Sequence, residues 1–297
     1  MRVTESSISY NYLSDINQTR GKIVDLQAQM ASGKRVLKPS DDPSATNAIL
    51  RLKASMQAND QYAKNVQEAS GMAQATTNAL DSFASLMMDL KDLLTKAANV
   101  SSGEALPTLA AQVDQILSES VAIANTNFNG KYLFGGTQTT VAPFTLAADR
   151  SSVAENPAGI DGAINFSVSE GLTQQVNISG EEAFQGTAIF GLMIQIRDQL
   201  SSGNQPTTAQ IDAVDQAFDH VTLESGKAGS FVQNLDTLSA HLDSQKTQLS
   251  LFLSNEQDAD IAESIMQLKQ QQAMLDAALN TGAQVLPKTL VDYLRTA

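Results

Sequence analysis

Apolar residues recur every seven positions along several long stretches of the chain, with a second apolar row between them. This pattern is typical of helices that pack side by side. The first stretch runs from Asn11 to Ser32, and Gly33 follows it directly. Glycine readily adopts the left-handed backbone that commonly ends a helix, so the pattern predicts a terminal helix that stops at Gly33. The two rows are Ile16, Ile23 and Met30, and Tyr12, Thr19 and Leu26.

A much longer helix is predicted to begin at Asp42-Pro43. The Asp42 carboxylate can accept hydrogen bonds from the free amides of a first turn, and Pro43 suits a position whose N–H is not needed. Two seven-residue rows follow, and no proline interrupts them before Leu106. These rows are Val66, Ala73, Leu80, Met87 and Leu94, and Ala69, Thr76, Phe83, Leu90 and Ala97. A helix of about 55 residues would be roughly 80 Å long.

Beyond this helix the pattern changes twice. Apolar residues at helical spacing predict a third helix over about 108–125, and Asn129-Gly130 behind it favours a tight turn. Helical periodicity then stops, and glycine, proline, threonine and valine become frequent. Two alternating runs, Ile164–Val168 and Gln174–Ser179, are typical of strands. Residues 137–186 are therefore predicted to be a small β-rich insertion.

Helical periodicity returns after the insertion. A short amphipathic helix is expected near 189–200, and a longer one begins near Thr207. The rows of the longer helix are Ala228, Leu235, Leu242 and Leu249, and Phe231, Leu238 and Phe252. A last helix carries Ile261, Leu268 and Leu275, with Ile265 and Leu279 beside them. It should end before Pro287 and leave a final amphipathic turn at Leu290–Leu294.

The order of these segments predicts a mainly α fold with a small β-rich insertion. We expect an elongated helical rod in which the two halves of the chain lie side by side. Residues 1–44 and 255–297 would form a paired terminal helical domain. Residues 45–136 and 187–254 would form the rod, and residues 137–186 an outer β-rich domain.

Composition limits the classes of function. Of 297 residues only 5% are aromatic, and Trp and Cys are absent, which disfavours a pocket built on bulky anchors and excludes disulfides and thiolate metal sites. The formal net charge is −13, of which residues 46–254 contribute −11. No run of Lys or Arg offers the positive surface that nucleic acid or an anionic membrane would need. We also expect no signal peptide in the first 30 residues and no membrane span, because neither has the apolar run it requires.

The residues that could form a metal site or a catalytic site each also have a purely structural interpretation. His220 and His241 are the only histidines and fall on different phases of the helical pattern, so a metal site or a Ser-His-Asp relay would lack converging partners. Asp258, Asp260 and Glu263 resemble part of a calcium loop. Acidic residues in a first helical turn also offset the helix dipole, and we favour that interpretation.

The segment Glu224–Ser230 contains a Gly-Lys pair, as phosphate-binding loops do. It lacks their earlier glycine and their following Ser or Thr, so we expect a loop or a helix irregularity there. No G-x-S-x-G motif occurs. The sequence thus offers no catalytic residue, no cofactor-binding residue and no metal ligand, and we expect that the protein is not an enzyme.

The two terminal segments bury too little apolar surface to offset the entropy of ordering them. We therefore expect both to be disordered in the monomer and to become ordered against neighbouring chains. The predicted subunit-interface residues are Ile16, Ile23, Leu26, Met30, Ile261, Ile265, Leu268, Leu275 and Leu279.

Between the first two predicted helices, two adjacent carboxylates lie beside lysines. They could belong to an active site, or they could separate the helices. We favour a domain joint in which Asp42 caps the second helix and residues 35–40 form an extended connector. The residues of this joint are Gly33, Pro39, Asp41, Asp42 and Pro43.

Three motifs together resemble the flagellin family: SGKRVLKPSDDPSAT from Ser32, NTNFNGKYLFGG from Asn125 and DADIAESIMQLKQQQAMLDAALNTGAQV from Asp258. They occur in the order that the family has. The resemblance runs from the N-terminus to about Gly136 and from about Thr207 to the C-terminus. The two prolines around the Asp pair, the Phe-Gly-Gly ending of the second motif and the small insertion are more similar to members that join the hook to the filament.

The resemblance implies a structural component of the bacterial flagellum that polymerises between hook and filament through its terminal helices. The implied partners are other copies of the chain, a neighbouring hook-associated protein, flagellin and a dedicated export chaperone. The implied location is extracellular, reached through the flagellar type III export apparatus without a cleaved signal peptide. The alternatives are a filament flagellin or, from a different class, a secreted coiled-coil adhesin or effector that acts through the β-rich insertion.

Overall fold

The computed structural model describes residues 5–99 and 105–285 of the chain. It divides into two compact units. The terminal unit comprises residues 1–57 and 246–297, and the central unit comprises residues 58–245. Helices α2 (Pro43–Ala98) and α6 (Thr208–Gln257) contribute residues to both. The boundaries of the three predicted domains stay a prediction.

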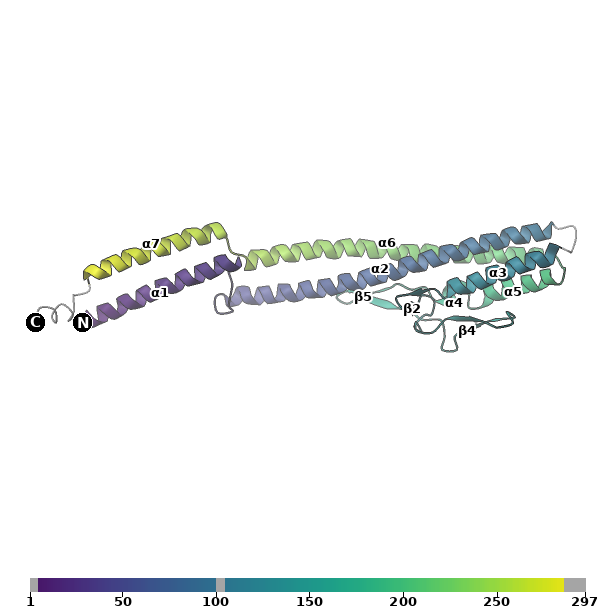
Figure 1. Cartoon of the computed structure of the whole chain (residues 1–297), viewed down its shortest axis with the longest axis horizontal. Helices are drawn as coiled ribbons and strands as arrows, with labels where there is room; N and C mark the ends of the chain where they lie inside the picture. The colour runs from purple at the N-terminus through teal and green to yellow at the C-terminus, as the bar shows by residue number, and fades with distance from the viewer. Residues whose placement is uncertain (1–4, 100–104, 286–297) are drawn as a thin grey trace, which may run out of the picture. The chain divides into compact units, whose positions relative to one another are not determined.

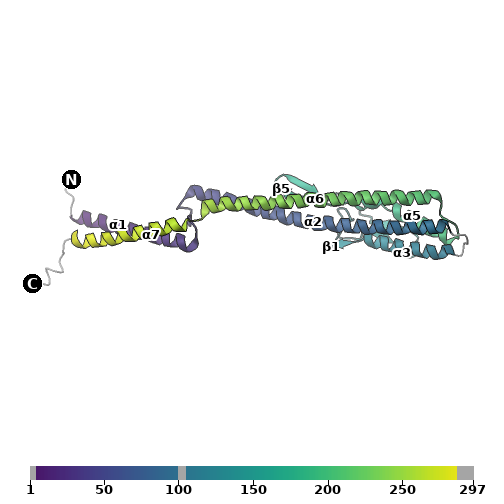
Figure 2. The same ribbon diagram turned by 90° about the horizontal axis from the view of Figure 1, so that it is seen from above.

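In the terminal unit, α1 (Glu5–Ser32) packs beside α7 (Ile261–Val285), as both views show (Figures 1 and 2). Helix α1 ends where the sequence predicts, and Gly33 after it has φ 69°. A small apolar cluster lies where α2 begins and α6 ends, and its members are Val36, Ala45, Ile49 and Leu253. The predicted turn at 290–294 and the predicted helix end before Pro287 lie outside the described residues.

In the central unit, α3 (Leu106–Ala124) and α5 (Ala188–Ser201) lie alongside α2 and α6, and α3 packs against α5 (Figure 1). All ten residues of the two predicted α2 rows are buried, none more than 1% exposed. A seven-residue repeat places these side chains along one continuous face of α2, so burial confirms the rows.

Helix α6 is continuous through Glu224–Ser230, so the expected loop or irregularity is wrong. Glycine costs about 1 kcal/mol relative to alanine within a helix. That cost is offset here because Val221, Ala228 and Leu235 are buried on the same helix. Lys227 donates to the buried carboxylate of Glu224 at 2.6 Å, which supplies that carboxylate with a charged partner.

Three antiparallel hairpins gather on one side of these helices (Figure 1). They pair β1 (Asn127–Phe128) with β2 (Lys131–Tyr132), β3 (Phe144–Leu146) with β4 (Val153–Glu155), and β5 (Asn165–Ser169) with β6 (Leu172–Gln175). Asn129 and Gly130 both have positive φ, which confirms the predicted tight turn between β1 and β2.

The predicted strand Gln174–Ser179 is wrong in its second half, since β6 ends at Gln175. Ser179 instead caps the short helix α4 (Gly180–Phe184). Its hydroxyl accepts from the Glu182 amide while the Glu182 carboxylate accepts from the Ser179 amide, which is a capping box. The hairpin of β3 and β4 was not predicted.

The β-rich segment and the helices share one core. Phenylalanines at 83, 134, 144, 184 and 190 are all under 2% exposed and pack ring against ring. Phe83 comes from α2 and Phe190 from α5, whereas Phe144 and Phe184 belong to the predicted insertion. The insertion therefore supplies side chains that complete the helical core.

Candidate functional site

The connector between α1 and α2 is hydrogen-bonded to the connector between α6 and α7. The Ala259 amide donates to the Gly33 carbonyl at 2.9 Å, and the Arg35 amide donates to the Gln257 carbonyl at 2.7 Å. Lys34 and Asp258 form an antiparallel bridge between them. We call residues 33–42 together with 256–259 the joint. All of it lies within the terminal unit.

Asp41 closes a turn in the joint. Its Oδ2 accepts from the amides of Leu37 at 3.2 Å and Lys38 at 2.8 Å, and its own amide donates to the Lys38 carbonyl at 3.0 Å. Pro39 occupies the second position of this turn, where its fixed φ is favourable. The prediction of an extended connector over 35–40 is therefore wrong at 38–40, because the Asp41 side chain folds the chain back there.

Asp42 uses its two oxygens for different partners. Oδ1 accepts from the amides of Ser44 at 3.1 Å and Ala45 at 2.9 Å, which confirms the predicted helix cap. Oδ2 accepts from Arg35 Nη1 at 3.2 Å. The Ala45 amide, followed by the Arg35 guanidinium, holds the pKa of the Asp42 carboxyl below its usual value. Arg35 Nη2 also donates to the Glu256 carbonyl at 2.9 Å.

The terminal helix pair buries only part of its predicted interface rows. Ile16 is buried at 7% exposure, while Ile261 and Leu279 are each 42% exposed and Ile265 is 38% exposed. The half-buried members are Ile23, Leu26, Met30, Leu268 and Leu275. Toward the ends of the pair, Tyr12 Oη donates to the Ala278 carbonyl. The role of these residues in binding a second subunit stays a prediction.

A second set of exposed apolar side chains lies on the same two helices and was missed in the sequence. Its members, more than half exposed, are Tyr10, Leu13, Val24, Met266 and Met274. They fall between the seven-residue rows, so a search for one seam overlooks them. Two helices can cover only one face of each other, and the remaining apolar surface is of the kind that marks an interaction site.

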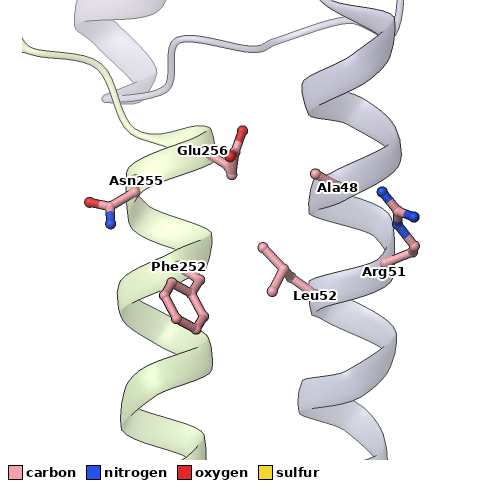
Figure 3. Close-up of a pocket in the computed structure, with 6 residues that line it drawn as sticks. All are labelled: Ala48, Arg51, Leu52, Phe252, Asn255 and Glu256. Carbon is pink, nitrogen blue, oxygen red and sulfur yellow. The ribbon is translucent and has the colours of Figure 1, made fainter.

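A groove lies between the start of α2 and the end of α6 (Figure 3). Leu52 projects from α2 toward α6, and Phe252 lies on the opposite wall (Figure 3). The other lining residues are Ala48, Arg51, Asn255 and Glu256. Phe252 is 57% exposed, so its predicted place in a buried row is wrong. The local apolar cluster is completed by Leu253 instead, and the groove stays open.

The polar residues singled out in the sequence have structural partners. His220 Nε2 lies 2.7 Å from the Glu182 carbonyl oxygen, which links α6 to α4. His241 is exposed on α6. Asp260 Oδ1 accepts from the Glu263 amide at 3.1 Å, as a cap of α7 does, and Asp258 accepts from the Ser254 hydroxyl at 2.6 Å.

Over residues 5–99 and 105–285, no group of three or more His, Asp or Glu side chains is placed to hold a metal ion. Among the helices in this described part of the chain, none has both the length and the hydropathy that crossing a bilayer requires.

Comparison with known proteins gives a consistent picture. The model of the bacterial flagellin N-terminal helical region matches residues 3–139. Flagellar hook-associated protein 3 of Salmonella typhimurium is 29% identical over 149 residues, which cover 50% of this chain and 47% of that protein. The chain thus spans about half the length of the curated hook-associated relatives it matches.

Two further matches cover more of the chain. A flagellin of Bacillus subtilis is 20% identical over 307 residues, covering 99% of this chain and 100% of that protein. The crystal structure of flagellar hook associated protein-3 from Legionella pneumophila has a TM-score of 0.61 at 14% identity. It covers 70% of this chain and 98% of that one, and at this identity it supports the fold alone.

Proposed function

We propose that the chain is a member of the flagellin family and a structural adaptor of the bacterial flagellum that polymerises at the junction between hook and filament. The observation that carries the proposal is the terminal helix pair, in which α1 packs against α7 and apolar side chains on both helices stay exposed. The family match and the hook-associated relatives support the place of this surface in a flagellar assembly.

The terminal helices are the proposed assembly surface. Ile261, Ile265 and Leu279 lie at the edge of the buried seam and are 38–42% exposed, so burial of the remaining surface of one such side chain against a neighbouring copy would contribute about 0.6–1.3 kcal/mol. In the free subunit the pair lacks this contribution, so we propose that it is protease-sensitive there and becomes protected on assembly.

The proposed partners are further copies of the chain, a neighbouring hook-associated protein, flagellin and a dedicated export chaperone. The proposed location is the flagellum outside the cell, reached through the type III export apparatus without cleavage of a signal peptide. The protein acts by binding and not by catalysis. The polar groups described above serve as helix caps and in hydrogen bonds to the backbone, and this use supports a structural role.

A filament flagellin is the second candidate. The observation in its favour is the Bacillus subtilis flagellin, which matches nearly the whole chain, although at lower identity than the hook-associated relative. The two candidates differ in where the subunit lies and in how many copies each flagellum contains.

Electron microscopy of a strain that lacks this chain separates the candidates. Hooks without filaments, with flagellin released into the medium, are expected for a junction adaptor. Loss of one filament type, with other filaments still attached to hooks, would favour a flagellin. Normal filaments and normal swimming would contradict both.

Complementation of that strain tests the assembly surface. Ile265→Asp and Leu268→Asp place a charge on the terminal seam and should abolish incorporation while the central unit keeps its helix content. Gln270→Asp, which adds the same charge at an exposed polar position of α7, is the matched control and should assemble. Equal assembly of all three variants would contradict the proposed surface.

A further inference from the structure

Arg35 contacts both halves of the joint although its partners are far apart in the sequence. Its guanidinium donates to Asp42 Oδ2 at 3.2 Å and to the Glu256 carbonyl at 2.9 Å, across a separation of 221 residues. Its backbone amide donates to the Gln257 carbonyl at 2.7 Å. One residue of the connector after α1 therefore binds the end of α6 through its side chain and through its backbone.

We infer that Arg35 is a positioning residue that caps the C-terminus of α6 from the other end of the chain and holds the Asp42 cap of α2 in place. The joint is therefore completed only when the N-terminal and C-terminal connectors have met. This goes beyond the proposed function, because it concerns how the subunit closes and requires neither hook nor filament.

The C-terminus of α6 lacks a nearby positive charge and the N-terminus of α2 lacks a nearby negative charge within their own turns. The last carbonyls of a helix lack intrahelical donors, and positive charge is favourable beside them, whereas negative charge is favourable at the first turn. Helix α6 has no basic residue in its last turn, and α2 has no acidic residue in its first turn. Arg35 and Asp42, both outside these turns, provide the missing cation and the missing anion.

A simple surface ion pair would not explain this arrangement. The side chains of Arg35 and Asp42 are 46% and 35% exposed, and exposed pairs contribute little to stability. Each partner here also has a backbone contact that the opposite charge could not make. The carboxylate accepts from the Ser44 and Ala45 amides, and the guanidinium donates to a carbonyl oxygen.

The backbone contacts make closure depend on both connectors. The Gly33 carbonyl accepts from the Ala259 amide, and the Gln257 carbonyl accepts from the Arg35 amide, so each connector supplies one donor and one acceptor. Neither connector can form these bonds within itself. A change on the C-terminal side should therefore loosen the N-terminal connector even when Arg35 and Asp42 are intact.

Hydrogen–deuterium exchange of the purified full chain tests the inference, with rates corrected for the intrinsic effect of each sequence. Arg35→Gln should raise exchange at least tenfold at the amides of residues 35 and 259, and Arg35→Lys should give a smaller rise. Lys53→Gln removes an equal charge from the exposed surface of α2, outside the groove and the joint, and is the matched control, expected to match the wild type. Peptides from α3 and α5 report whether the central unit stays folded in each variant.

Two further variants decide between a cap and an ion pair. The exchanged pair, Arg35→Asp with Asp42→Arg, should stay as unprotected as Arg35→Gln, because each charge then faces the wrong helix end. Ala259→Pro removes the amide that donates to Gly33 and should raise exchange at residue 35 at least tenfold. Restored protection in the exchanged pair, or an unchanged rate at residue 35 in Ala259→Pro, would overturn the inference. The filament assays above do not affect this result, so the two proposals can fail separately.

Discussion

Phe184 lies at the centre of the aromatic core, and its removal is the most demanding test of the fold. Its ring centroid lies 4.7 Å from that of Phe83, 4.9 Å from Phe134, and 5.7 Å from both Phe144 and Phe190. It is fully buried. Phe184→Ala therefore removes a ring that contacts residues of α2, α5 and the β-rich segment at once.

The expected loss of stability follows from the packing. Truncation of a buried phenylalanine to alanine costs about 3–5 kcal/mol, and paired rings add about 0.5–1.5 kcal/mol per pair beyond area burial. Because Phe184 has four ring neighbours, we expect a value in the upper half of that range, about 4–5 kcal/mol. A domain of this size loses about 2–4 °C of Tm per kcal/mol, so the melting temperature should fall by roughly 8–20 °C.

Urea unfolding followed by circular dichroism measures this change in the full chain. Phe252→Ala is the matched control, because the same substitution at a ring that is 57% exposed should change the free energy of unfolding by no more than about 0.5 kcal/mol. A Phe184→Ala variant within 1 kcal/mol of the wild type, or two variants of equal stability, would refute the reasoning.

The remaining predictions concern one side chain each. Asp42→Asn should reduce the dependence of the free energy of unfolding on acidic pH. A carboxyl whose pKa is lowered in the folded state stabilises the fold at pH values above its unfolded pKa of 3.8, and this contribution is lost as the pH falls through the folded pKa. Guanidinium unfolding from pH 2 to 6 measures the difference. Gly136→Ala should lower the Tm of the central unit, since a Cβ there would overlap the backbone of Asp161 and the position has a positive φ, whereas Gly21→Ala meets open space within α1 and should raise the Tm slightly. Arg197→Gln should cost about 1–3 kcal/mol in urea unfolding, since the 13% exposed side chain pairs with two aspartates.

The shared core complicates a test of the adhesin alternative in which the β-rich insertion is deleted. Deletion of residues 137–185 would remove Phe144 and Phe184 and expose the helical rings that they cover. Lost function in that deletion would therefore reflect unfolding as well as a lost surface. Leu172→Ser, at a residue of β6 that is 54% exposed, changes the outer surface and spares the core.

The sequence predicts those features whose cause is local or repeats along one helix. The α2 rows could be identified because burial among packed helices repeats every seven residues. The cap at Asp42-Pro43 could be identified because its hydrogen bonds reach only two and three residues ahead. The stop at Gly33 likewise depends on one residue and its positive φ.

Contacts between distant segments leave no such pattern. The five core phenylalanines have no regular spacing, and only the chain topology brings their rings together. The acceptor of Arg35 at the end of α6 is a backbone carbonyl, which any residue at position 256 would provide. The hairpin of β3 and β4 has strands of three residues, too short for alternation to be recognised, and is held by the Asn125 side chain, which bonds both the amide and the carbonyl of Phe144.

The two units differ in net charge, and this difference bears on the proposed assembly surface. The terminal unit carries 12 Lys and Arg against 11 Asp and Glu, whereas the central unit carries 7 against 21. Electrostatic repulsion between two such central units is therefore expected, and it is screened over about 8 Å at physiological salt. The terminal unit is nearly neutral and is also where apolar side chains are exposed on α1 and α7. The proposed approach of copies through the terminal helices would therefore meet little electrostatic opposition.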